Sequence, residues 1–139
     1  MENKEQILEK LNTWGGETLG KTLDIIFTDV TDDTLTATMP VTPKVHQPYG
    51  ILHGGASCVL AETLGSSLSV LHVDTEKFGP VGTNINSNHL RSVKKGIVTG
   101  TAKFIRKGNT MHVSEIEIRD EKGTLINHTT MTNNIIPRK

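Results

Sequence analysis

A histidine, two glycines and a carboxylate stand at fixed spacing in the middle of the chain. The segment from Gln47 passes through proline and glycine to His53-Gly54-Gly55, and then enters a mostly apolar stretch whose only acidic residue is Glu62. Helix N-termini carry unpaired N–H groups and partial positive charge, so they stabilise developing oxyanions. A helix that starts at the glycines would supply an oxyanion donor, and Glu62 would supply a reactive carboxylate. This combination indicates acyl-group chemistry.

Glu62 is the candidate catalytic group, either as a nucleophile that attacks a carbonyl carbon or as a general base that activates water. The sequence does not separate these two routes. Ser66 lies one helical turn further on the same face and could orient Glu62 or the water. A solvated helical glutamate is the alternative, but the apolar neighbours of Glu62, among them Leu60 and Leu64, predict that it is shielded from solvent.

The residues before the helix offer hydrogen-bond donors. The backbone N–H of Gly54 suits an oxyanion, and one preorganised donor of this kind stabilises the charge by roughly 3 kcal/mol. Gln47 could offer its side-chain amide as a second donor. His53 could bond the reacting group, could fix the loop that carries Gln47, or could simply be a histidine at a helix entry. A glycine-rich turn without chemistry remains the alternative for the motif as a whole.

The spacing of the two main candidates has a geometric consequence. Gly54 and Glu62 are eight residues apart, which is about 12 Å along a helix axis. One carbonyl group cannot easily meet both from the same chain. If both act, the amide comes from one subunit and the carboxylate from another, with two long helices packed antiparallel about a two-fold axis. We therefore expect a homodimer as the minimal active unit. The expected assembly is a homotetramer, a dimer of dimers, which the spacing itself does not require.

The elements that would position these residues follow from apolar periodicity. Three- and four-residue steps predict a short N-terminal helix and one long interior helix, whereas alternation predicts six strands. Short turns between the later strands predict an antiparallel meander. The fold class is α+β, with about six antiparallel strands wrapped around one central helix. The expected helices are 7–14 and 53–71, and the expected strands are 18–30, 34–41, 80–92, 97–106, 111–119 and 124–136.

Composition narrows the class of protein. The 139 residues are expected to form one domain, 1–139, and 15 basic against 15 acidic residues give no net charge, which does not favour a nucleic-acid partner. A single cysteine, Cys58, excludes an internal disulfide framework. The N-terminus lacks the pattern of a signal peptide, and no apolar stretch reaches the roughly 20 residues of a membrane span. We expect a soluble, cytoplasmic protein with no membrane partner.

The joint spacing of several residues resembles the hotdog-fold acyl-CoA thioesterases, in the branch that carries an HGG motif before a helical glutamate. Within that branch the chain is most similar to bacterial aryl-CoA thioesterases acting on hydroxybenzoyl, phenylacetyl or dihydroxynaphthoyl thioesters. The resemblance implies that Gly54 is the oxyanion donor, that the site lies at a dimer interface, and that coenzyme A is part of the substrate rather than a cofactor. The residues that carry it are Gln47, His53, Gly54, Gly55, Glu62 and Ser66, followed by Asn86-Ser-Asn-His89-Leu-Arg91-Ser92.

Coenzyme A carries phosphates, which require cationic or polar donors at the mouth of the site. The resemblance supports Arg91 and Ser92 most strongly and places His89 in the acyl pocket or against the site loop. Lys94 and Lys95 form a first basic turn, and 106–108 form a second one that could contribute, although such turns are more often only solvated. The substrate-binding candidates are Gly55, His89, Arg91, Ser92, Arg106, Lys107 and Gly108. No metal site is expected, because the six histidines show no zinc-type spacing and no cysteine partner.

Two other functions remain open. Hydratases and dehydratases also use this fold, often with a His-Phe-Pro type segment that is absent here. A non-catalytic acyl-CoA-binding module would keep Arg91 and the pocket, and it would have no need for Glu62.

Overall fold

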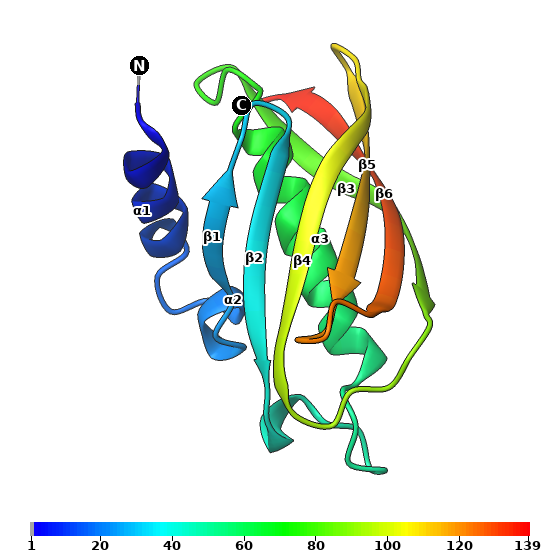
Figure 1. The fold of residues 1–139 in the computed structure, drawn as a ribbon. Coiled ribbons are helices and arrows are strands. Elements are labelled where there is room, and N and C mark those ends of the chain that lie inside the picture. The colour runs from blue at the N-terminus through cyan, green and yellow to red at the C-terminus, as the bar shows by residue number, and fades with distance from the viewer. Residues whose placement is uncertain (1) are drawn as a thin grey trace.

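The structure, a computed structural model, describes residues 2–139. Six antiparallel strands form one sheet in the order β1-β2-β4-β5-β6-β3, and the sheet curves around the long helix α3 (Figure 1). The predicted α+β architecture is confirmed. The helices are α1 (Lys4–Trp14), α2 (Leu19–Thr22), the 3-10 turn η1 (Pro43–Val45) and α3 (Gly54–Val70), and the strands are β1 (Ile26–Val30), β2 (Thr34–Val41), β3 (Phe78–His89), β4 (Gly96–Lys107), β5 (Met111–Arg119) and β6 (Leu125–Pro137).

Helix α3 lies close against the sheet because its inward side alternates leucines with very small residues. Leu60, Leu64 and Leu68 have no exposed surface. At Gly65 the helix is so near the sheet that a side chain would collide with the buried Met131 of β6 and would come within 2.9 Å of the Ser114 hydroxyl. Neither α3 nor any other helix within residues 2–139 combines the length and apolar character needed to cross a membrane.

The strands contribute the other half of the core. Along β5 the buried residues alternate, and they are His112, Ser114, Ile116 and Ile118. Leu35 and Met39 of β2 are likewise fully buried. This strict alternation is expected when one face of a sheet packs on a helix and the other faces solvent.

The predicted strand over 18–30 is wrong in its first half. Residues Leu19–Thr22 form the short helix α2, and Asp24 follows with a positive φ of 55°. A left-handed residue turns the chain sharply, so β1 begins only at Ile26. In α1, Leu11 is buried, but Trp14 is 65% exposed and does not join the core.

The predicted meander holds for β4, β5 and β6 and is wrong for β3. Strand β3 pairs with β6 at the far edge, and β4 lies between β2 and β5. The chain therefore crosses from one edge of the sheet back to its middle after β3. Because β3 ends at His89, Arg91 and Ser92 lie in this crossing segment rather than on a strand.

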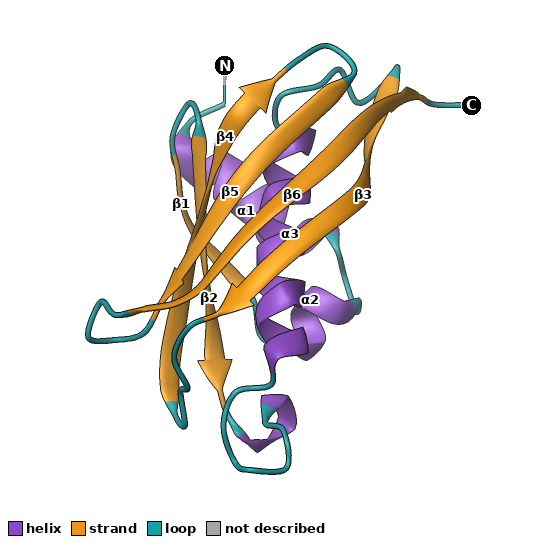
Figure 2. Cartoon of the chain, turned by 90° about the vertical axis from the view of Figure 1, so that its right-hand side faces the viewer, coloured by secondary structure: helices purple, strands orange, loops and turns teal. Residues whose placement is uncertain are grey.

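The two edges of the sheet differ. At β1, the Asn12 side chain donates to the Phe27 carbonyl at 3.0 Å and accepts from the Phe27 N–H at 2.8 Å, so α1 occupies that edge much as another strand would. At the other edge, β3 pairs only with β6 among the described residues (Figure 2). An unpaired edge is a template for another strand. Within residues 2–139, only the β3 edge is open in this way.

Candidate active site

The start of α3 leaves one backbone amide free. The His53 ring caps the helix, since its Nδ1 accepts from the Gly55 N–H at 2.8 Å. The Ala56 N–H bonds to the His53 carbonyl at 3.0 Å. Within residues 2–139 no acceptor is bonded to the Gly54 N–H. Gly54 is therefore the donor available at this helix terminus, and His53 acts here as a helix cap.

A cavity of about 350 Å³ lies at the same end of α3. It brings together five of the residues that the sequence singled out, although they come from three separate segments. They are Gln47, Gly54, His89, Arg91 and Ser92. The Gly54 donor thus shares one pocket with Arg91 and Ser92, two of the candidate coenzyme A contacts.

Backbone hydrogen bonds hold the walls of this pocket in place. The crossing segment after β3 is tied to β6, because the Leu90 N–H donates to the Ile126 carbonyl at 2.8 Å. The same segment is tied to the loop before α3, because the Leu52 N–H donates to the Val93 carbonyl at 2.7 Å. The segment that crosses from β3 to β4, which the predicted meander did not include, therefore carries Arg91 and Ser92 to the start of α3.

Gln47 is oriented by its own loop. Its side-chain oxygen accepts a hydrogen bond from the Tyr49 N–H. With the oxygen held in this way, the amide nitrogen keeps both hydrogens for donation. Gln47 is therefore set up as a donor rather than an acceptor at the pocket wall.

His89 lies with its ring against Gly54. A β-carbon built on Gly54 would stand 2.7 Å from the ring Nε2, 2.9 Å from Cε1 and 3.1 Å from Cδ2. Three nearly equal distances mean that the ring presents its face, not its edge, to the glycine. Only a residue without a side chain fits here. Because glycine has no side chain, the Gly54 N–H also stays accessible to a ligand.

Glu62 lies elsewhere on α3, and the prediction that it is shielded is wrong for the single chain. Its side chain is exposed, because the apolar neighbours that were expected to cover it turn inward to the sheet. One carboxylate oxygen lies 3.6 Å from the position that a β-carbon on Gly82 of β3 would take. Ser66, one turn further on, is half-buried. Glu62 does not line the pocket at Gly54.

The second basic turn is also far from that pocket. Residues Lys107, His112, Asn133 and Gly82 are paired in one row across β4, β5, β6 and β3. The turn at 106–108, at the top of Figure 1, therefore lies in the same row as Gly82, which is beside Glu62, whereas α3 begins in the lower part of the figure. In one chain the predicted site residues form two groups: Gln47, Gly54, His89, Arg91 and Ser92 at one end, and Glu62, Ser66 and 106–108 toward the other.

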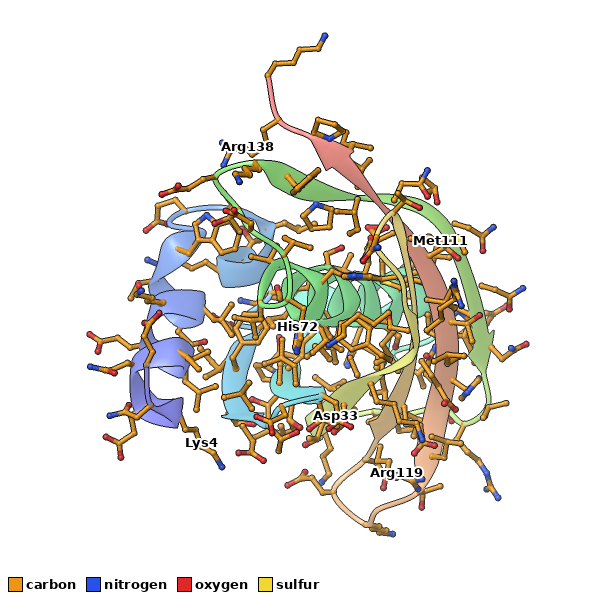
Figure 3. All side chains as sticks on the ribbon, turned by 90° about the horizontal axis from the view of Figure 1, so that it is seen from above. Lys4, Asp33, His72, Met111, Arg119 and Arg138 are labelled. Carbon is orange, nitrogen blue, oxygen red and sulfur yellow. The ribbon has the colours of Figure 1, made fainter. Side chains whose placement is uncertain are left out.

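A buried polar cluster lies beneath the second half of α3. His112 is buried, and its Nδ1 bonds to the Ser69 hydroxyl at 2.9 Å. Burial, together with the positive charges of nearby His72 and Lys107, lowers the pKa of His112 from its usual value. Figure 3 shows His72 near the middle of this end of the molecule.

The described residues contain no group of three or more His, Cys, Asp or Glu side chains that could hold a metal ion.

Comparison with known proteins agrees with this architecture. A family model described as the thioesterase superfamily matches residues 49–127. The 1,4-dihydroxy-2-naphthoyl-CoA hydrolase of Escherichia coli is 46% identical over 129 residues, covering 93% of this chain and 94% of that protein. A solved structure of a mutant thioesterase from Pseudomonas aeruginosa superposes with a TM-score of 0.93 at 43% identity, covering 94% of each chain.

Two solved structures of a Staphylococcus aureus protein, called a thioesterase in one of them, are 42% identical to this chain. Their TM-scores are 0.85 and 0.84, and they cover 87% and 86% of this chain and 100% and 98% of that one. One carries alanine in place of a glutamate and the other carries alanine in place of a glutamine, at positions 15 residues apart. The chain described here belongs to the thioesterase superfamily and is a thioester hydrolase with the hotdog fold.

Proposed function

We propose that the protein hydrolyses an aromatic or medium-size acyl-CoA to the free acid and coenzyme A. Glu62 acts as nucleophile or general base, and the Gly54 N–H of the neighbouring subunit stabilises the oxyanion. The observation that carries the proposal is the pocket in which the free Gly54 N–H stands beside Arg91 and Ser92. The reaction needs no metal or redox cofactor.

The relatives support both the chemistry and the substrate class. The Escherichia coli relative is named for an aromatic acyl-CoA. In the Staphylococcus aureus relative, the substituted glutamine and glutamate are 15 residues apart, which is also the spacing of Gln47 and Glu62. We infer that Gln47 contributes a donor to the thioester carbonyl and that Glu62 carries the chemical step.

The open edge of β3 supports assembly of the two groups of site residues across a dimer. Gly82, beside Glu62, and His89, beside Gly54, lie on this same edge strand. Antiparallel pairing of two β3 strands about a two-fold axis near the middle of the strand would bring the Gly82 end of one strand to the His89 end of its copy. Glu62 of one chain would then approach Gly54 of the other. Ile85 is 37% exposed, so such pairing would also cover apolar surface.

In this dimer Arg91 and Ser92 would bind coenzyme A phosphates near the Gly54 entrance. Arg106, Lys107 and Gly108 would approach from the Glu62 side, and Gly55 would help to keep the helix entrance open. A tetramer would pair two such dimers.

The test is thiol release from benzoyl-CoA and from aliphatic acyl-CoAs of increasing length. Wild type should release thiol, with the highest kcat/KM on an aromatic or medium-size acyl group. Glu62→Ala should lower kcat by about 10² to 10⁴-fold, the range contributed by a positioned acid or base. Glu9→Ala, which removes an exposed glutamate from α1, is the matched control and should keep full activity. Undiminished release by Glu62→Ala would refute the mechanism, and no release from any thioester would favour a binding module.

A further inference from the structure

A closed set of hydrogen bonds under the site fixes which nitrogen of His89 carries the hydrogen. Four polar side chains take part, from directly paired positions of β3 and β6: Ser87 with Thr129, and His89 with Asn127. Asn127 and Thr129 have no exposed surface. Buried polar groups retain their partners because losing one costs about 1–3 kcal/mol.

The direction of each bond in this set can be worked out. The Thr129 hydroxyl donates to Asn127 Oδ1 at 2.7 Å. Since that uses the only hydrogen of Thr129, the bond of 2.8 Å between the Ser87 and Thr129 hydroxyls must be donated by Ser87. Asn127 Nδ2 then donates to the Ser87 oxygen at 2.8 Å.

The remaining hydrogen of Asn127 Nδ2 faces His89. Nδ2 lies 3.0 Å from His89 Nδ1. An amide nitrogen only donates, so His89 Nδ1 must be the acceptor and carries no hydrogen. In a neutral imidazole the hydrogen is then on Nε2. The buried residues thus make Nε2 a donor.

This donor stands beside the free amide of Gly54. His89 Nε2 lies 2.7 Å from the β-carbon position of Gly54, and that position is about 2.5 Å from the Gly54 nitrogen by standard backbone geometry. The two nitrogens are therefore at most about 5 Å apart, and two donors each about 2.9 Å from one oxygen can be that far apart. Because the ring shows its face to Gly54, its N–H edge is free to point past the glycine toward a ligand.

We propose that His89 Nε2–H is a donor to the thioester oxygen together with Gly54 N–H, and that Asn127, Ser87 and Thr129 are positioning residues that hold His89 in this tautomer. The inference rests on the proposed function and assigns His89 a role in the chemical step, beyond lining the pocket. When the thioester carbon is attacked, negative charge collects on its oxygen, and both donors bind that charge more strongly than the neutral carbonyl.

The direct test measures which nitrogen of His89 carries the hydrogen. Nitrogen–proton correlation spectra of the imidazole rings should show His89 with its hydrogen on Nε2, assigned by the signal that disappears in His89→Asn. In Asn127→Asp the partner becomes an acceptor, so at alkaline pH the hydrogen should move to Nδ1. A wild-type hydrogen on Nδ1 would overturn the proposal, whether or not a substrate has been found.

The kinetic test uses two substitutions, each of which places an amide nitrogen at the position of one of the two imidazole nitrogens. The amide nitrogen of His89→Gln reaches the place of Nε2 and can donate, whereas that of His89→Asn reaches only the place of Nδ1. His89→Asn should lose about 10² to 10³ in kcat, the usual effect of removing one oxyanion donor. His89→Gln should lose less than about tenfold. Equal losses in kcat, or a loss confined to KM, would contradict the proposal.

Asn127→Asp adds a signature that a merely structural role would not give. Its kcat should be low at alkaline pH and should recover as the pH falls, because a protonated imidazole carries hydrogen on both nitrogens. If this variant does not fold, the two His89 variants carry the test. His128→Asn is the matched control, since His128 also lies on β6 but bonds to Glu115 at 2.8 Å, and its activity should not change. Inactive wild type with His89 protonated on Nε2 would refute the proposed function and leave the tautomer assignment standing.

Discussion

At the scale of single residues, Gly54 combines two features. Its N–H has no partner among the described residues, and a β-carbon at this position would stand only 2.7 Å from the His89 ring. Gly54→Ala should therefore displace His89 and lower kcat by about 10²-fold, as the loss of one donor does elsewhere. Steady-state kinetics checks the size of the loss. Alanine at position 54 should cost much less when His89 is already alanine, and additive losses would contradict this coupling.

His112 gives a pH dependence of stability. Its pKa is lowered by burial and by the positive charges of His72 and Lys107, so the native state favours the neutral ring. The unfolded chain takes up the proton more readily, near the ordinary pKa of about 6.5. Stability should be complete above that pH and should fall as the pH drops below it toward the native value. Melting temperatures at pH 7.5 and 5.5 test this, and the fall should be smaller in His112→Asn.

The structure brings together several residues that the sequence singled out. Gly54, Gln47, Arg91 and Ser92 line one pocket, and their roles in it stay predictions. They could be singled out because the glycine spacing and the lone helical carboxylate are local signals. The exposure of Glu62 could not be read from its neighbours, since residues adjacent on a helix face different directions. Asn127 was missed because its role depends on the pairing of β6 with β3, which no local pattern contains.

At the scale of elements, the close approach of α3 to the sheet depends on Gly65. Alanine is a better helix former by about 1 kcal/mol, but a methyl group there would press on Met131 and on Ser114. Overpacking of this kind costs about 1–3 kcal/mol, so Gly65→Ala should be destabilised despite its propensity. Denaturant unfolding measures the change. Gly20→Ala in α2, whose methyl meets nothing within 4 Å, is the control and should be neutral or stabilising.

The elements show what periodicity determines and what it leaves open. Apolar spacing predicted α3, β2 and β5 at nearly their observed bounds. It did not reveal that Asp24 turns the chain before β1, because a positive φ at a non-glycine residue has no strong local signature. It also could not choose partners, since alternation specifies the faces of a strand and not its neighbours. The expectation that β3 stands next to β4 in the meander is an error of that kind, because β3 lies beyond β6 at the far edge of the sheet.

At the scale of the whole molecule, the two groups of site residues lie beside different parts of β3, one near Gly82 and the other near His89. The open edge of β3 can pair with a second copy of the chain. If the site forms across two chains, a dimer of Glu62→Ala with Gly54→Ala contains one intact site and one that is doubly altered. Random mixing of the two inactive variants by co-expression should restore about a quarter of wild-type activity, since half of the dimers are mixed and each has one working site.

Purification through two different affinity tags isolates the mixed dimer, which should reach about half of wild-type activity. A site contained in one chain predicts the opposite result, because every chain then carries a defect and the mixed dimer stays inactive. The mixed dimer contains one unaltered Gly54 and one unaltered Glu62, and they lie on different subunits. Its activity therefore shows whether a site combines residues of two subunits or of one.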